Sequence, residues 1–183
     1  MRKRKLLPTM FLLLLSAAPL LAQVGGREPL NNKEIDELRE TAQEPDKRLK
    51  LMVQFARARL ATIEQLRGDP RLAAERGARV HDLLEDFTKL VDEMGDNLDD
   101  YVARKEDLRA ALKAVIEGDT AFQLKLRTLT EQGPGAGGKA TEVQEYTFVL
   151  QNATEAVNSS LDDARKLLAE QEVAIKEAKK KKK

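Results

Sequence analysis

The sequence contains no cysteine, no tryptophan and one histidine, and aromatic residues make up only 4% of its 183 positions. Without cysteine the chain has no disulfide, no thiolate zinc site and no cysteine nucleophile. A single histidine excludes metal sites built from several imidazoles. Lysine and arginine number 32 and aspartate and glutamate 31, so the overall charge predicts no nucleic-acid partner. We therefore expect one modest domain that is stabilised by packing alone and needs no cofactor.

The first 22 residues have the layout of a secretory signal peptide. Four basic residues at positions 2–5 precede an apolar run from Leu6 to Leu21, and small residues follow its centre. This pattern predicts export to the periplasm or the extracellular space, with cleavage between Ala22 and Gln23. The alternative is an uncleaved N-terminal membrane anchor. The apolar run is short for a membrane span and holds Pro8 and Pro19, which favours removal.

Removal of this segment leaves an acidic chain with a basic end. Residues 23–183 keep 28 basic and 31 acidic residues, a net charge of −3, because all four basic residues of 1–22 are lost. Five of the remaining positive charges are consecutive at the end of the chain. We predict a solvated, disordered tail there, with contact to an acidic partner or to anionic lipid headgroups at a membrane surface as the alternative. The residues are Lys179, Lys180, Lys181, Lys182 and Lys183.

The rest of the chain predicts helix almost throughout, over residues 32–178. Residues 23–31 contain two glycines and a proline and are predicted to form a flexible linker. Asn31 and Glu34 have the spacing of a helix-capping box. A helix over 46–67 follows, and Gly68-Asp69-Pro70 is typical of one helix ending and another beginning.

An apolar heptad repeat begins at Val80. Its first core position is apolar without exception through Leu129, and its companion position is apolar except at Lys105 and Asp119. Such alternating spacing of three and four residues predicts an all-α fold of long antiparallel helical hairpins with a coiled-coil-like heptad seam. The first position holds Val80, Phe87, Met94, Tyr101, Leu108, Val115, Phe122 and Leu129, and its companion holds Leu84, Val91, Leu98, Lys105, Leu112, Asp119 and Leu126.

Two architectures satisfy this seam. One helix over 71–131 gives three long helices, whereas a break at Gly95 gives a four-helix bundle. We favour continuity, because a single interior glycine costs a helix only about 1 kcal/mol. The glycines between 133 and 138 predict a flexible hairpin turn before a last helix over 141–178. Gly138-Lys139 is followed by alanine, so this turn is not a phosphate-binding loop.

The hairpins predict which residues face each other. A turn near residue 136 sets Phe122 opposite Leu150 and Leu108 opposite Ala164. Residues 46–67 carry six basic and two acidic residues, whereas residues 82–100 carry eight acidic and one basic. A turn near residue 69 therefore brings opposite charges together and predicts three sets of neighbours: Arg57 with Asp82, Lys50 with Glu85 and Asp86, and Lys47 with Asp92.

The densest group of carboxylates carries two interpretations. Clustered carboxylates bind hard cations such as calcium, but they also form solvated faces that pair with a basic helix. The pairing above favours the solvated face, so we predict no metal site. His81 has no recognisable nucleophile around it, so we predict no catalytic residue. The group consists of Asp92, Glu93, Asp96, Asp99 and Asp100.

These patterns indicate an exported, non-enzymatic helical interaction or scaffold protein of the cell envelope. Its partners are predicted to be other proteins or further copies of itself. Two alternatives remain open: a periplasmic chaperone or adaptor for envelope clients, and a helical protein that binds divalent cations.

Export predicts a processed N-terminus. Intact-mass measurement of the protein recovered after expression with its own N-terminus should give the mass of Gln23–Lys183 in the soluble exported fraction. Recovery of the unprocessed chain in the membrane fraction would instead establish the uncleaved anchor.

Overall fold

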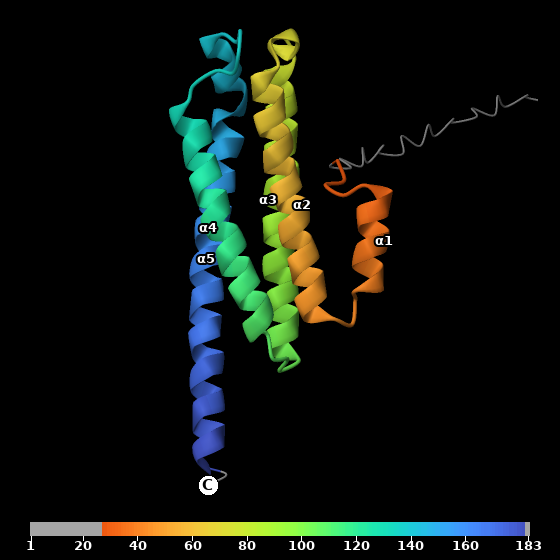
Figure 1. The fold of residues 1–183 in the computed structure, drawn as a ribbon, viewed down its shortest axis with the longest axis vertical. Helices are drawn as coiled ribbons and strands as arrows, with labels where there is room; N and C mark the ends of the chain where they lie inside the picture. The colour runs from red at the N-terminus through yellow and green to blue at the C-terminus, as the bar shows by residue number, and fades with distance from the viewer. Residues whose placement is uncertain (1–26, 182–183) are drawn as a thin grey trace, which may run out of the picture.

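The computed structural model describes residues 27–181, so the predicted signal peptide and its cleavage site at Ala22 and Gln23 lie outside the described residues. Within 27–181 the chain forms helices and no strand, which confirms the all-α prediction (Figure 1). The α-helices are α1 (Asn32–Glu40), α2 (Pro45–Gly68), α3 (Arg76–Ala103), α4 (Arg109–Glu131) and α5 (Ala140–Lys181), with a short 3-10 helix, η1 (Pro70–Leu72), between α2 and α3.

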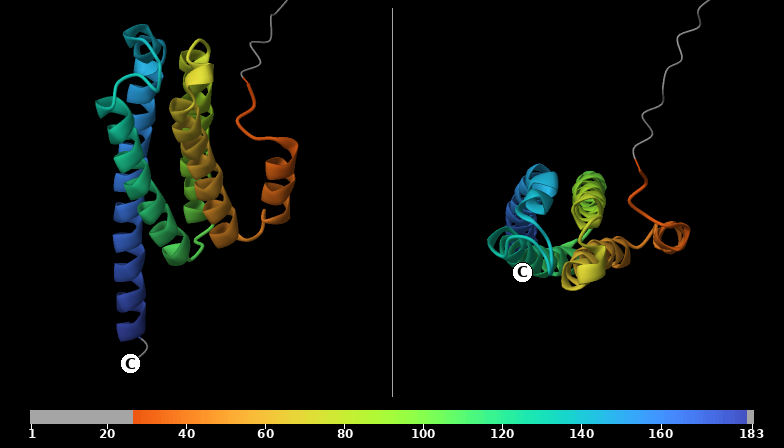
Figure 2. Two further views of the ribbon diagram at one scale, coloured as in Figure 1. Left: turned by 45° about the horizontal axis from the view of Figure 1, so that its top comes forward. Right: turned by 90° about the horizontal axis from the view of Figure 1, so that it is seen from above.

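Helices α2 to α5 form a four-helix bundle made of two antiparallel hairpins, α2/α3 and α4/α5 (Figure 1). Seen along the bundle, α2 lies beside α4 and α3 lies beside α5, each pair parallel, so α3 and α4 occupy diagonal corners (Figure 2). The Phe87 and Phe122 rings meet between these diagonal helices, edge to face, with centroids 5.3 Å apart. Helix α1 packs on the outer side of α2.

The heptad seam forms the core of this bundle. Every residue of its first position is buried, from Val80 at 0% exposure to Leu129 at 6%. The companion position is buried as well, except at Lys105. Burial of these large side chains contributes about 1.5–3 kcal/mol each relative to exposure, and is the main favourable term in folding. The predicted seam is confirmed.

The break between α3 and α4 lies at Arg104–Leu108 rather than at Gly95. Helix α3 runs through Gly95 without interruption, so the helix is continuous there as favoured, but the prediction of one helix over 71–131 was wrong. Lys105 has a left-handed φ of 60°, and the amides of Lys105 and Glu106 donate to the carbonyls of Val102 and Tyr101. This is a Schellman helix end, with lysine where glycine is usual.

The observed pairing differs from the predicted one in both hairpins. The Leu108 amide donates a 2.9 Å hydrogen bond to Oε1 of Gln171. Gln171 lies seven residues further along α5 than Ala164, the predicted neighbour of Leu108. The ion pair that joins α2 to α3 is Arg48–Glu93, at 3.6 Å. Within 27–181, the residues predicted to be neighbours form no ion pairs with each other. Asp82 and Asp86 instead bind Arg27 of the N-terminal segment.

That N-terminal segment is packed, in contrast to the flexible linker predicted over 23–31. Besides the Arg27 ion pairs, the Pro29 carbonyl accepts from Arg59, and residues 23–26 lie outside the described part of the chain. The predicted capping box of Asn31 and Glu34 is confirmed, at 2.9 and 3.0 Å. Glu34 also takes two hydrogen bonds from Arg59, which fastens α1 to α2.

A completely buried arginine joins the loops at one end of the bundle. Arg76, at 0% exposure, forms a 3.0 Å ion pair with Glu142 at the start of α5. Its guanidinium also donates to three carbonyl oxygens at 2.7–2.9 Å, those of Leu66, Asp69 and Ala136. One side chain therefore ties the end of α2, the η1 segment and the α4–α5 loop to the start of α5.

The glycine-rich α4–α5 loop is shaped around this arginine. A Cβ atom at Gly135 would lie 2.5 Å from Nη1 of Arg76 and 2.8 Å from the Arg67 carbonyl. The Gly135 amide donates to Glu142 at 3.1 Å, and the Ala136 amide donates to Arg67 at 2.8 Å. The predicted flexible turn is thus anchored to the bundle by backbone hydrogen bonds that require close approach.

Helix α5 extends past the other helices. It runs to Lys181 rather than ending at 178, so Lys179, Lys180 and Lys181 are helical instead of forming a disordered tail, and Lys182 and Lys183 lie outside the described residues. Its 42 residues span about 63 Å, and its last turns project beyond the bundle (Figure 1). Across 27–181, no helix combines the length and hydrophobicity needed to cross a membrane.

Replacing Arg76 tests the role of the buried pair. Arg76→Met leaves the Glu142 carboxylate buried without its partner, and losses of about 3–5 kcal/mol in the free energy of unfolding are typical of such changes. Urea unfolding followed by circular dichroism measures the loss. Arg71→Met, at an exposed arginine nearby, is the matched control and should have little effect. Arg76→Met/Glu142→Leu should recover part of the stability, because it also removes the unpaired charge.

Candidate functional site

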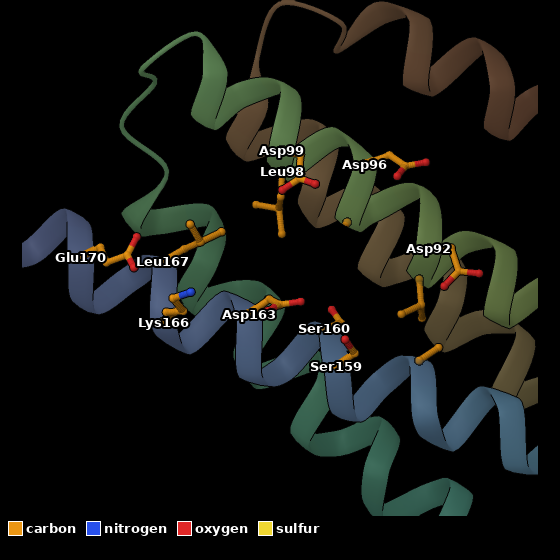
Figure 3. Close-up of a pocket in the computed structure, with 13 residues that line it drawn as sticks. Asp92, Asp96, Leu98, Asp99, Ser159, Ser160, Asp163, Lys166, Leu167 and Glu170 are labelled. Carbon is orange, nitrogen blue, oxygen red and sulfur yellow. The ribbon is translucent and has the colours of Figure 1, made fainter.

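A large concave feature of the described residues is a groove between the parallel helices α3 and α5. It encloses about 680 Å³ and is lined by six residues of α3 and seven of α5. The two helices face each other across it, with Leu98 and Leu167 pointing into the space between them (Figure 3). We call this feature the α3–α5 groove.

The α3 rim of the groove contains three of the five clustered carboxylates found in the sequence. Asp92, Asp96 and Asp99 line the groove. Their spacings of four and three residues place them on one face of the helix, as predicted. Asp100 does not line the groove, and Glu93 lies within 3.6 Å of Arg48 on α2. Within 27–181, the prediction that this cluster pairs with the basic helix therefore holds for Glu93 alone.

The α5 rim adds charges that the sequence analysis did not connect with this cluster. Asp163 and Glu170 line the groove opposite α3, and Lys166 lies between them (Figure 3). The rims together carry five acidic residues and one basic residue, a net charge of −4. The sequence did hold a signal for these rim charges, because Asp163 and Glu170 are one heptad apart, as are Asp92 and Asp99. Only the parallel packing of α3 and α5 shows that the two pairs share a groove.

The groove is not uniformly polar. Ala156 and Leu167 of α5 are half-buried and contribute apolar surface between the charged rims, whereas Val91 and Leu98 of α3 line the groove but are almost completely buried. Loss of solvation, followed by repulsion from Asp96, raises the pKa of Asp92 above its usual range. An apolar surface flanked by carboxylates suits an amphipathic segment that carries positive charge.

A buried carboxylate lies behind the wall of the groove. Asp119 of α4 is 0% exposed, and its Oδ2 accepts a 2.8 Å hydrogen bond from the hydroxyl of Ser160, which lines the groove. Its Oδ1 is buried and has no hydrogen-bond partner among the described residues. Burial raises the pKa of Asp119 to about 6. The hydrogen bond from Ser160 lowers the pKa and offsets only part of this rise. The polar residue at a core position of the heptad is therefore an acid that binds its proton near neutral pH.

The groove carboxylates are spread along the groove rather than gathered around one point. Over the described part of the chain, no three acidic or histidine side chains lie close enough together to hold a metal ion. The carboxylates instead follow the two rims of an elongated groove, an arrangement that matches an extended positive ligand better than a single ion.

The other candidates lie away from the groove. His81 is partly exposed, and its Nδ1 lies 3.8 Å from Asp82. Lys179, Lys180 and Lys181 lie on α5 beyond Glu170 and do not line the groove. The acidic groove and the lysines at the end of α5 are thus separate charged regions of the molecule.

Comparison with known proteins identifies no relative: no family model, no curated protein and no solved structure matches this chain. Its function is therefore inferred from its own residues.

Asp119 should make the stability of the protein depend on pH. Its pKa is about 6 when folded and 3.8 in its ordinary state, so between these values the folded protein binds more protons than the unfolded chain. Stability therefore falls as pH rises through this window, by up to about 3 kcal/mol. The penalty is absent below about pH 4, where both states are protonated.

Asp119→Asn should remove this pH dependence while keeping an acceptor for Ser160. Urea unfolding at several pH values gives the difference between the two proteins, which should grow from pH 4 to pH 7 in favour of the variant. Ser160→Ala should enlarge the penalty, because it removes the bond that opposes the pKa rise. Parallel curves for the original protein and Asp119→Asn would contradict the assignment.

Proposed function

We propose that this chain is an exported, non-enzymatic interaction protein that binds a basic, amphipathic segment of a protein partner in the α3–α5 groove. The observation that carries the proposal is the groove itself, with an apolar surface between two rims of carboxylates. Export is supported by the basic and apolar layout of residues 1–22, typical of a secretory signal.

The charge of the groove favours one class of ligand. Five carboxylates and a single lysine repel phosphate and nucleic acid and attract lysine- or arginine-rich peptide. The apolar residues between the rims favour a ligand with a hydrophobic face rather than a uniformly charged one. Because the rim charges are exposed to solvent, they contribute more to orientation and encounter rate than to affinity.

Peptide binding tests this proposal. Fluorescence anisotropy with a labelled amphipathic helical peptide of lysine and leucine should show binding at low salt that weakens at high salt. A glutamate–leucine peptide of the same pattern should not bind. Asp96→Lys/Asp163→Lys reverses one charge on each rim and should weaken binding by roughly tenfold or more.

A matched variant separates the groove from overall charge. Asp36→Lys/Glu155→Lys makes the same change in net charge at exposed positions outside the groove. It should leave binding almost unchanged. Equal loss in both variants would show attraction to the whole acidic body rather than recognition by the groove, and would defeat the proposal.

A further inference from the structure

The projecting end of α5 makes few contacts with the bundle: Ala174 and Ile175 lie beside the α3–α4 turn, and residues 176–181 are exposed. The last hydrogen bonds from α5 to other helices or loops are those of Gln171, to the Leu108 amide and the Glu106 carbonyl at 2.9 and 3.0 Å. The part of the helix after Gln171, residues 172–181, is called the α5 arm here. A helical segment this short is marginal in water without tertiary contacts. A surface that packs against the arm would therefore stabilise it.

The composition of the arm complements the groove. The arm carries four lysines and two glutamates, a net charge of +2, whereas the groove lining has a net charge of −4. It also presents apolar side chains, including Val173, which is 54% exposed. The groove offers the half-buried Leu167 and Ala156 between its charged rims. Both the charge and the apolar surface of the arm thus have a counterpart in the groove.

The two features also match in length. The arm, from Glu172 to Lys181, spans about 15 Å as a helix. The groove residues of α3 run from Val91 to Asp99, about 12 Å, and those of α5 from Ala156 to Glu170, about 21 Å. A helical arm of this size therefore fits along the groove.

The arm cannot reach the groove of its own molecule while α5 stays helical. Glu170 lies at one end of the groove, and the helix continues straight from it into the arm, away from the groove (Figure 1). In a second copy placed antiparallel beside the first, the order of groove and arm along α5 is reversed. Each arm then lies against the groove of the other copy.

We propose that two copies of this protein pair by placing each α5 arm in the α3–α5 groove of the other. The contact is isologous: the two-fold arrangement fills both grooves with both arms at once, so it closes as a dimer rather than growing into a filament. This inference rests on the proposed binding role of the groove and names a second copy as its partner.

Sedimentation velocity of Gln23–Lys183, which contains every described helix, tests the pairing. We expect a dimer at low salt that dissociates at high salt, because exposed charges are screened. Lys179→Glu/Lys180→Glu/Lys181→Glu in the arm should weaken pairing by roughly tenfold or more, and so should Asp92→Lys/Asp96→Lys/Asp99→Lys in the groove. Asp36→Lys/Glu40→Lys/Glu155→Lys makes the same change in net charge as the groove variant, at exposed positions outside the groove, and should still pair.

Mixing the arm variant with the groove variant is the decisive step. Each negative arm then meets a positive groove, and each unchanged arm meets an unchanged groove, so the mixture should form a heterodimer although neither variant pairs alone. Circular dichroism of each variant confirms that its helices remain folded. No heterodimer from two folded variants would overturn the arm-in-groove contact.

Other outcomes separate this inference from the proposed function. A chain that stays monomeric while its groove still binds the lysine–leucine peptide overturns self-pairing and leaves the partner role intact. A chain that neither pairs with itself nor binds the peptide overturns both the self-pairing and the proposed function. A dimer unaffected by the arm and groove variants overturns the inference alone. A monomer whose arm binds phosphatidylglycerol vesicles, with loss of binding in the arm variant, overturns it in favour of a membrane contact.

Discussion

The ion pair between Arg76 and Glu142 is the interaction on which the geometry of the bundle depends. It joins the two hairpins at the end where both their loops lie, and Arg76 also binds three loop carbonyls. A buried charge this well partnered tolerates little displacement, because any shift leaves polar groups buried without partners. The pair therefore sets the position of α5 at its start, beside α3.

That position creates the groove. Because α3 and α5 run parallel from the anchored end, carboxylates spaced by heptads on each helix follow the two rims of one groove. The same helix then continues past the bundle as a lysine-rich arm. Helix α5 thus carries one rim of an acidic groove and, beyond it, a basic arm. Asp119, held by Ser160 behind the groove wall, adds a buried acid that titrates near neutral pH.

The turn between α3 and α4 shows how a sequence pattern hides a break. The heptad phase continues from Tyr101 to Leu108 across the turn, because both residues are needed in the core. Lys105, the polar exception in the repeat, occupies the left-handed position of the helix end. Its side chain is exposed there, so a lysine at a core position marked the turn, whereas Gly95 caused no break.

The sequence by itself determined the helical class, the buried heptad seam, the capping box at Asn31 and the hairpin turns near residues 69 and 136, because these follow from local periodicity and end signals. It did not reveal the break at Arg104–Leu108. It also placed Asp92, Asp96 and Asp99 on one helix face. Only the tertiary structure decided that the hairpins stack with α3 beside α5, that pairing in the α4/α5 hairpin is shifted by a heptad, and that Arg76 is a core residue. The physical reason is that these features depend on contacts between segments far apart in the chain. A heptad seam is compatible with several helix arrangements, and packing together with the buried ion pair selects one of them.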